Sequence, residues 1–240
     1  MESCITFKNL SIGYRPKHQL RVIASAVSAS LHPGELTCLI GANGVGKSTL
    51  LRTLCGFQPA LDGEILLQDQ PLSAYPAQQL ARQIGVVLTS RVDVPQLSVK
   101  EIVGIGRSPY TNFWGTLTPA DQQIVDEAIH QVGIPHLAQR NISELSDGER
   151  QKTMIAKALA QQTRIIILDE PTAFLDFPSK VETLQMLLRL AHEQHKAILL
   201  STHDVELALQ LADSLWLMEQ NRLSVGTPKS LATDGSLSRF

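Results

Sequence analysis

The segment GANGVGKST at residues 41–49 constrains the possible folds of this chain more than any other segment. It fits the pattern G-x-x-x-x-G-K-[ST], in which a glycine-rich loop joins a strand to a helix and surrounds phosphate groups with backbone N–H groups. The flanking sequence agrees, because the apolar run ELTCLI (35–40) precedes the loop and a stretch predicted as helix from Lys47 to Cys55 follows it. The loop therefore predicts a nucleotide site at the end of a buried strand.

The residue types in this loop suit the binding of phosphate and Mg²⁺. Glycines let phosphate oxygens approach the backbone, and a helix N-terminus favours negative charge. We expect Lys47 to reach the β- and γ-phosphates, Ser48 to bind Mg²⁺ through its hydroxyl, and Thr49 to lie near the α-phosphate. The other loop residues expected to contact the nucleotide are Gly41, Asn43, Gly44 and Gly46.

Two further strand ends carry polar residues that suit phosphate chemistry. The apolar run IIIL (165–168) is followed by Asp169, a candidate Mg²⁺ ligand, and by Glu170, a candidate general base for the attacking water. His203 follows the apolar strand AILLST (197–202), where a neutral imidazole can hydrogen-bond the γ-phosphate and the attacking water. A histidine at a strand end is more often structural, so its position alone does not decide its role.

The segment LSDGERQK (145–152) predicts the start of a helix. Ser146 and Glu149 have the spacing of a capping box. Gly148 lies in the first turn, where glycine costs about 1 kcal/mol relative to alanine. A small residue there suggests that another group comes close, and a phosphate at this helix N-terminus is the natural candidate.

Strands that alternate with helices predict an α/β fold. We expect a RecA-like P-loop core formed by residues 1–91 and 162–240, with an antiparallel β portion near the N-terminus, and an inserted helical subdomain at residues 92–161. More locally, the patterns predict a turn at 61–63, helices at 77–84, 98–106, 119–132, 147–161, 178–194 and 204–212, strands at 164–169 and 197–202, and a hairpin near 215–226.

Composition and charge bear on which partners the chain can bind and where it acts. The net charge is −2, so the chain has no electrostatic footprint for nucleic acid or an anionic membrane surface. Its three cysteines form no disulfide or zinc pattern, and Cys38, in an apolar run, is expected to be a buried free thiol. With no signal-peptide pattern and no apolar run near about 20 residues, we expect a cytoplasmic protein whose membrane role depends on a partner.

The ordered set of these motifs resembles the ATP-binding subunits of ABC transporters over essentially the whole chain. LSDGERQ (145–151) is similar to the family's signature sequence, DEPTAFLD (169–176) to its acidic pair and D-loop, and STHD (201–204) to its switch histidine. The resemblance implies a homodimer that sandwiches two ATP molecules between head-to-tail copies. It also implies roles at the nucleotide for Tyr14, which stacks on adenine, for Ser146, Asp147, Gly148 and Glu149, which face the γ-phosphate held by the other copy, and for Asp176.

The resemblance implies partners as well. In this family the ATPase lies on the cytoplasmic face of the inner or plasma membrane and is bound to permease subunits. A substrate-binding protein delivers the substrate to these permease subunits. The stretch GRSPYTNFWGTLTPADQQIVDEAI (106–129) is similar to ATPases of importers for iron–siderophore, haem and cobalamin complexes. Within it, Tyr110, Phe113 and Trp114 are expected to pack in the helical subdomain or to line the groove for the permease's coupling helix.

Three positions depart from the family pattern. Thr89 stands where the family has a glutamine at the end of the strand GVVLT, so its shorter hydroxyl side chain would have to reach the metal. Asp147 and Glu149 replace a glycine and a glutamine in the signature. Two carboxylates near a triphosphate oppose its binding, and the helix N-terminus offsets part of that repulsion.

Three other functions share some of these features. A soluble ABC ATPase acting on ribosomes or DNA usually has two nucleotide domains or a long coiled coil, and the sequence shows neither. A GTPase switch requires an N-K-x-D element, which the sequence lacks. The ATPase of an exporter, or of another importer group, stays open, because only residues 106–129 argue against it.

We predict that Asp147→Gly raises the steady-state rate of ATP hydrolysis, because it removes a negative charge close to the γ-phosphate. The measurement is phosphate release at saturating ATP. A rate that is unchanged or lower would contradict the electrostatic argument.

Overall fold

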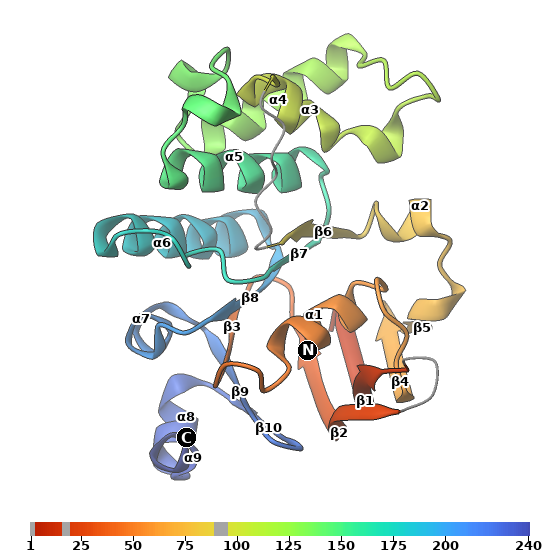
Figure 1. Ribbon diagram of the computed structural model, residues 1–240, viewed down its shortest axis with the longest axis vertical. Coiled ribbons are helices and arrows are strands. Elements are labelled where there is room, and N and C mark those ends of the chain that lie inside the picture. The colour runs from red at the N-terminus through yellow and green to blue at the C-terminus, as the bar shows by residue number, and fades with distance from the viewer. Residues whose placement is uncertain (1–2, 16–19, 89–95) are drawn as a thin grey trace.

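Two β-sheets and the helices packed on them form the lower and middle parts of the molecule, and a helical region lies above them (Figure 1). The computed structural model describes residues 3–15, 20–88 and 96–240. In these ranges strands alternate with helices, which confirms the predicted α/β fold. The proposed subdomain boundaries at 91/92 and 161/162 stay a prediction.

The larger sheet has the strand order β10-β9-β3-β8-β7-β6. β3, β8, β7 and β6 run parallel and are almost wholly buried, which explains their continuous apolar sequences. β9 is parallel to β3 and forms the predicted hairpin with β10. The strands are β3 (Leu36–Gly41), β6 (Ile84–Val87), β7 (Ile165–Leu168), β8 (Ala197–Thr202), β9 (Ser214–Glu219) and β10 (Arg222–Gly226).

The smaller sheet is antiparallel, with the order β2-β1-β4-β5. The turn predicted at residues 61–63 is wrong for Asp62 and Gly63, which already belong to β4. Gly63 has φ +87°, and a side chain there would collide with the backbone of Asn9 in β1, so strand contact rather than a turn requires this glycine. The strands are β1 (Ile5–Tyr14), β2 (Arg21–Leu31), β4 (Asp62–Leu67) and β5 (Gln70–Pro71).

The helical region contains the three helices predicted there, and each begins with a capping box. The helix predicted at 77–84 is shorter, because Ile84 pairs with Ile165 as the start of β6. The helices are α1 (Lys47–Leu54), α2 (Ala77–Leu80), α3 (Val99–Ile105), α4 (Pro119–Gln131), α5 (Asp147–Ala160), α6 (Phe177–Gln194), α7 (Val205–Leu211), α8 (Pro228–Thr233) and α9 (Ser236–Arg239). No helix in the described ranges is long and apolar enough to cross a bilayer.

Two hydrophobic cores hold these layers together. One joins the larger sheet to the helices from α3 to α7, and the other fills the space between the two sheets and α1. In the second core, the fully buried Trp216 packs edge-to-face on Phe7, with ring centroids 5.5 Å apart. Cys38 is a buried free thiol, as predicted, and burial raises its pKa to about 12.

The helical region has a polar centre at Arg107. Its guanidinium donates to Asp121 Oδ1 and to Ala160 O, both at 2.9 Å, and lies 4.1 Å from the centroid of the Tyr110 ring. The expectation that Phe113 and Trp114 also pack here is wrong, because their exposed fractions are 94% and 84%. Both follow Asn112, whose side-chain oxygen accepts from Trp114 N at 3.1 Å and fixes a turn that directs the rings into solvent.

Candidate functional site

The loop that contains the phosphate-binding motif joins β3 to α1. Gly46 has φ +119°, and a Cβ atom on it would collide with the side chain of Ile23. Gly44 has φ +79°, also in the left-handed region. The motif's glycines therefore meet a conformational requirement that the fold imposes here.

The N-terminus of α1 lacks the internal caps found elsewhere in the chain. Its N-cap is Gly46, which offers no side-chain acceptor, and its first turn has no acidic residue. By contrast, α3, α4, α5 and α6 each have a Ser, Thr or Asp side chain that accepts an N-terminal N–H. The first N–H groups of α1 are thus left for an external anion, which fits a phosphate group.

Lys47, the first residue of α1, has a buried side chain at the end of the loop. Its side chain is 5% exposed, and Nζ donates to Gly41 O at 2.8 Å. Burial lowers the pKa of Lys47, while the nearby carboxylates of Glu170 and Asp169 act in the opposite direction. A polyphosphate in the loop would supply the negative charge that favours the ammonium form.

Asp169 follows β7 and accepts hydrogen bonds from two hydroxyls. The Ser48 Oγ lies 3.1 Å from Asp169 Oδ1, and the Ser201 Oγ lies 2.7 Å from the same oxygen. Ser201 also accepts from Glu170 N at 2.9 Å. Ser201 was missed by the sequence reasoning, although it lies in the STHD segment, and only the pairing of β7 with β8 shows its role.

The oxygen atoms of Ser48 and Asp169 are the donors that Mg²⁺ prefers. In the described ranges, no group of three or more His, Cys, Asp or Glu side chains forms a ready-made metal site. These residues therefore fit an ion that takes most of its ligands from phosphate oxygens and water. Thr89, the third predicted metal ligand, lies outside the described residues.

Glu170 and His203, the two predicted catalytic residues, are in direct contact. His203 Nε2 meets Glu170 Oε1, and Lys47 Nζ lies 3.5 Å from His203 Nδ1 and 4.0 Å from Glu170 Oε1. Glu170 has φ +50°, which is uncommon for a residue with a side chain and is typical of functional sites. The fold thus brings three residues from different parts of the chain to one point.

Tyr14 lies at the end of β1, beside α1. Its hydroxyl is 3.0 Å from Thr49 Oγ1, and its ring is 42% exposed. A cavity of about 790 Å³, lined in part by Asn43, Gly44 and His203, opens beside the loop and is large enough for a nucleotide. Tyr14 instead lines a separate hollow of about 530 Å³.

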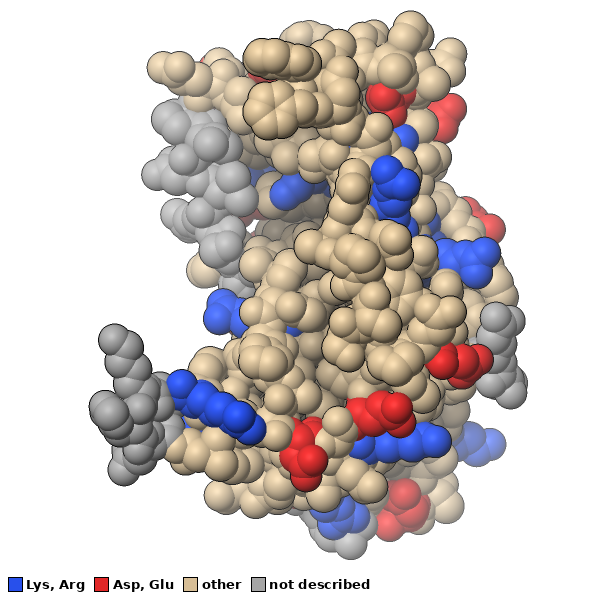
Figure 2. Space-filling model, turned by 90° about the vertical axis from the view of Figure 1, so that its right-hand side faces the viewer, with Lys and Arg blue, Asp and Glu red and all other residues tan. Residues whose placement is uncertain are grey.

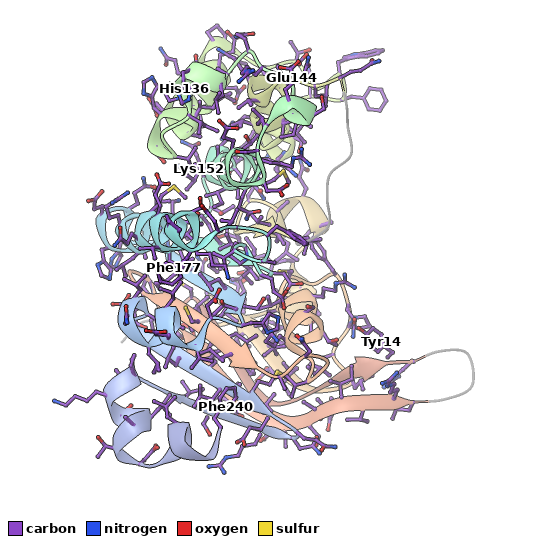
Figure 3. The ribbon with its side chains drawn as sticks, turned by 60° about the vertical axis from the view of Figure 1, so that its left-hand side comes forward. Tyr14, His136, Glu144, Lys152, Phe177 and Phe240 are labelled. Atoms are coloured by element: carbon purple, nitrogen blue, oxygen red, sulfur yellow. The ribbon has the colours of Figure 1, made fainter. Side chains whose placement is uncertain are left out.

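The signature segment lies apart from this cluster. Figure 1 places α5 above α6, and in Figure 3 Lys152 of α5 likewise lies above Phe177 of α6, whereas Tyr14 lies lower, at the end of the antiparallel strands. The capping box is formed: Ser146 N donates to Glu149 Oε2 at 2.9 Å, and the hydrogen bonds from Ser146 lower the pKa of Glu149. A Cβ on Gly148 would meet only Leu175 and Ser179, at 3.8 and 3.9 Å, so the described part of this chain does not require a glycine there.

Asp176 is the N-cap of α6. Its Oδ1 accepts from Ser179 N at 3.2 Å, and hydrogen bonds from Ser179 lower the pKa of its carboxyl group. This capping role explains the residue without a nucleotide, and its predicted contact with one stays a prediction.

We predict that Gly46→Ala lowers the affinity for a fluorescent ATP analogue at least about tenfold, because the new methyl group collides with Ile23 and distorts the loop. The measurement is equilibrium fluorescence titration. Gly133→Ala is the matched control: Gly133 also has positive φ, +76°, but open space around it, and lies outside the site. Equal affinities for the two variants would contradict the prediction.

Comparisons with known proteins show the family of the chain. Residues 24–173 match the family model described as "ABC transporter". An uncharacterised ABC transporter ATP-binding protein of Methanocaldococcus jannaschii is 40% identical over 93% of this chain and 76% of its own length. The ferric enterobactin transport ATP-binding protein of Escherichia coli is 31% identical over 97% of this chain and 85% of its own length.

A solved structure shows the same fold. An ABC transporter described as of the metal-chelate type, in an inward-facing conformation, superposes with a TM-score of 0.84 at 28% identity, over 98% of this chain and 88% of that one. The family match covers more than half of the chain and includes both the phosphate loop and the acidic pair. The chain therefore belongs to the ABC transporter family, and it is an ABC-type ATPase that binds and hydrolyses ATP.

Proposed function

We propose that this chain is the ATP-hydrolysing subunit of a membrane importer for metal chelates of the iron–siderophore, haem or cobalamin type. The observation that carries the proposal is the likeness to a metal-chelate type transporter over nearly the whole of both chains, and not only around the nucleotide loop. The relative named for ferric enterobactin transport supports the same class of cargo.

The site geometry supports the following roles. Lys47 and the first N–H groups of α1 bind the phosphates, and Ser48 and Asp169 hold Mg²⁺, which neutralises charge on the phosphate oxygens when it is bound. Glu170 accepts the proton of the attacking water, and His203, in contact with it, orients that water and the γ-phosphate. Tyr14 stacks on the adenine, and its bond to Thr49 places the ring beside the loop.

A second copy of the chain completes the site in this proposal. Ser146 and Asp147 are exposed at the start of α5, and a Cβ on Gly148 would come no closer than 3.8 Å to the neighbouring atoms of the described residues. In the proposed dimer, this exposed surface approaches a γ-phosphate held by the other copy. Asp176, at the start of α6, belongs to the same proposed contact region.

The proposed partners follow from the cargo. The ATPase binds a membrane-spanning permease on its cytoplasmic face, and a substrate-binding protein delivers the chelate to that permease. The chain has no described helix that could cross the membrane, so its attachment would depend on the permease.

Uptake measurements in cells that lack this chain test the class of cargo. The cells receive radiolabelled iron–siderophore, haem, cobalamin or an amino acid, one at a time. We expect the uptake of one metal chelate to fall to background and to return with the wild-type chain, while amino-acid uptake is unchanged. Loss of amino-acid uptake alone, or no loss at all, would overturn the proposal.

We predict that Glu170→Gln keeps ATP affinity but lowers turnover by at least about a hundredfold, because the amide cannot accept the proton of the attacking water. It should also trap an ATP-bound dimer, measured by size-exclusion chromatography with light scattering. Ser201→Ala, which leaves the Glu170 carboxylate in place, is the comparison and should retain more activity. Undiminished turnover in Glu170→Gln would remove Glu170 from the role of general base.

A further inference from the structure

Two neighbouring aromatic side chains, Phe113 and Trp114, stand in solvent on the loop between α3 and α4. Their exposed fractions are 94% and 84%, and their rings contact each other edge-to-face with centroids 5.5 Å apart. A single exposed apolar residue needs no explanation, but two adjacent aromatic side chains, each with about 150–250 Å² of surface, form a patch. Water is a poor solvent for such a patch, so a partner that covers it would be favourable.

Hydrogen bonds fix the turn that carries this aromatic pair. Asn112 Oδ1 accepts from Trp114 N at 3.1 Å and from Thr116 N at 3.3 Å, and Gly115 N donates to Asn112 O at 3.0 Å. Gly115 has φ +67°, a left-handed conformation that glycine adopts without strain. The two rings are therefore presented by a preformed turn, and a partner would not have to order it.

Both ends of the loop are anchored in the helical region. Before the turn, the Tyr110 hydroxyl donates to Gln161 O at 3.1 Å, and the Tyr110 ring lies 4.1 Å from the Arg107 guanidinium carbon. After the turn, Leu117 packs against the core of the helical region, beside Gly104 of α3. The aromatic pair is thus held at a fixed position relative to α3 and α4.

No charged side chain is exposed from Arg107 to Asp121, a stretch that the structure describes throughout. These two residues are buried and bond to each other at 2.9 Å, and every residue between them is uncharged. In Figure 1 the loop, coloured yellow-green, projects at the upper right, and Figure 2 looks onto that side of the molecule. There the middle of the upper surface is uncharged, while most basic and acidic residues lie below it or to its right (Figure 2).

We propose that Phe113 and Trp114 insert into the boundary between the headgroups and acyl chains of the bilayer that holds the permease. Aromatic rings are enriched at this boundary, and tryptophan suits it because its ring has an apolar body and a polar N–H. The amide of Asn112 and the hydroxyl of Thr116 would remain among the headgroups. The inference rests on the proposed function, because the permease is what brings the chain to a membrane.

The shape of the loop favours lipid over a protein partner. Both rings are so exposed that they stand out from the surface instead of lining a groove, so a protein would need a matching pocket, whereas acyl chains adapt to a protruding shape. Charged groups usually set the register of a protein contact, and this stretch exposes none. Two inserted rings alone bind a membrane weakly, so they act as a second contact that orients a chain already attached to its permease.

The test uses the complex of this chain with its permease, reconstituted in nanodiscs of phosphatidylcholine with plain or brominated acyl chains. Bromine atoms quench tryptophan fluorescence only at short range. The chain has two tryptophans, and Trp216 is fully buried, so Trp114 is the one that can reach lipid. Subtracting the fluorescence of the Trp114→Phe complex removes the contribution of all other tryptophans, those of the permease included.

We expect brominated lipid to quench this Trp114 difference signal. A difference signal that is shifted to the blue but not quenched would show that the permease covers the ring, and it would overturn the inference. A signal that is identical to that of the isolated chain, with either lipid, would overturn it as well.

A double variant measures what the rings contribute. Phe113→Ser combined with Trp114→Ser should make the chain leave the nanodisc complex about tenfold to a hundredfold faster, as expected for lost burial of two aromatic rings. The ATPase rate and the Tm of the isolated chain should be unchanged, because both rings are exposed there. Val225→Ser, which removes an exposed apolar side chain from β10, is the matched control and should behave as wild type.

The outcomes separate this inference from the proposed function. If the wild-type chain recovers no membrane-spanning partner, the proposed function fails and this inference fails with it. If the complex forms but the double variant dissociates at the wild-type rate, the proposed function stands and the bilayer contact is overturned.

Discussion

The relative register of β3, β7 and β8 is the constraint on which the nucleotide site depends. Ile40 lies opposite Thr202, and Leu168 lies opposite Leu200, so all three strands end at the same edge of the sheet. The loop that begins at Gly41, the acidic pair and His203 therefore emerge side by side, although more than 120 residues separate the loop from the acids. A shift of one residue in β7 would turn Asp169 to the other face and remove it from Ser48.

The same constraint explains why one copy of the chain holds only part of a site. The sheet edge brings together Lys47, Glu170 and His203, and the opposite charges of Lys47 and Glu170 compensate one another in part. The signature begins a helix in another layer, where the described residues leave room for a side chain at Gly148. A site divided in this way allows ATP to act as the connection between two copies, since neither copy alone surrounds the γ-phosphate in the proposed arrangement.

The sequence predicted local elements well where the physical cause was itself local. Capping boxes, apolar runs and the glycine-rich loop depend on residues close in the chain, and α3, α4, α5 and the parallel strands were placed within a few residues. Predictions that depended on distant partners did less well. Gly63 resembles a turn residue until β1 is seen against it, and Ser201 has no special signal until β8 is placed beside β7. Phe113 and Trp114 resemble core residues, yet the turn at Asn112 directs them outward.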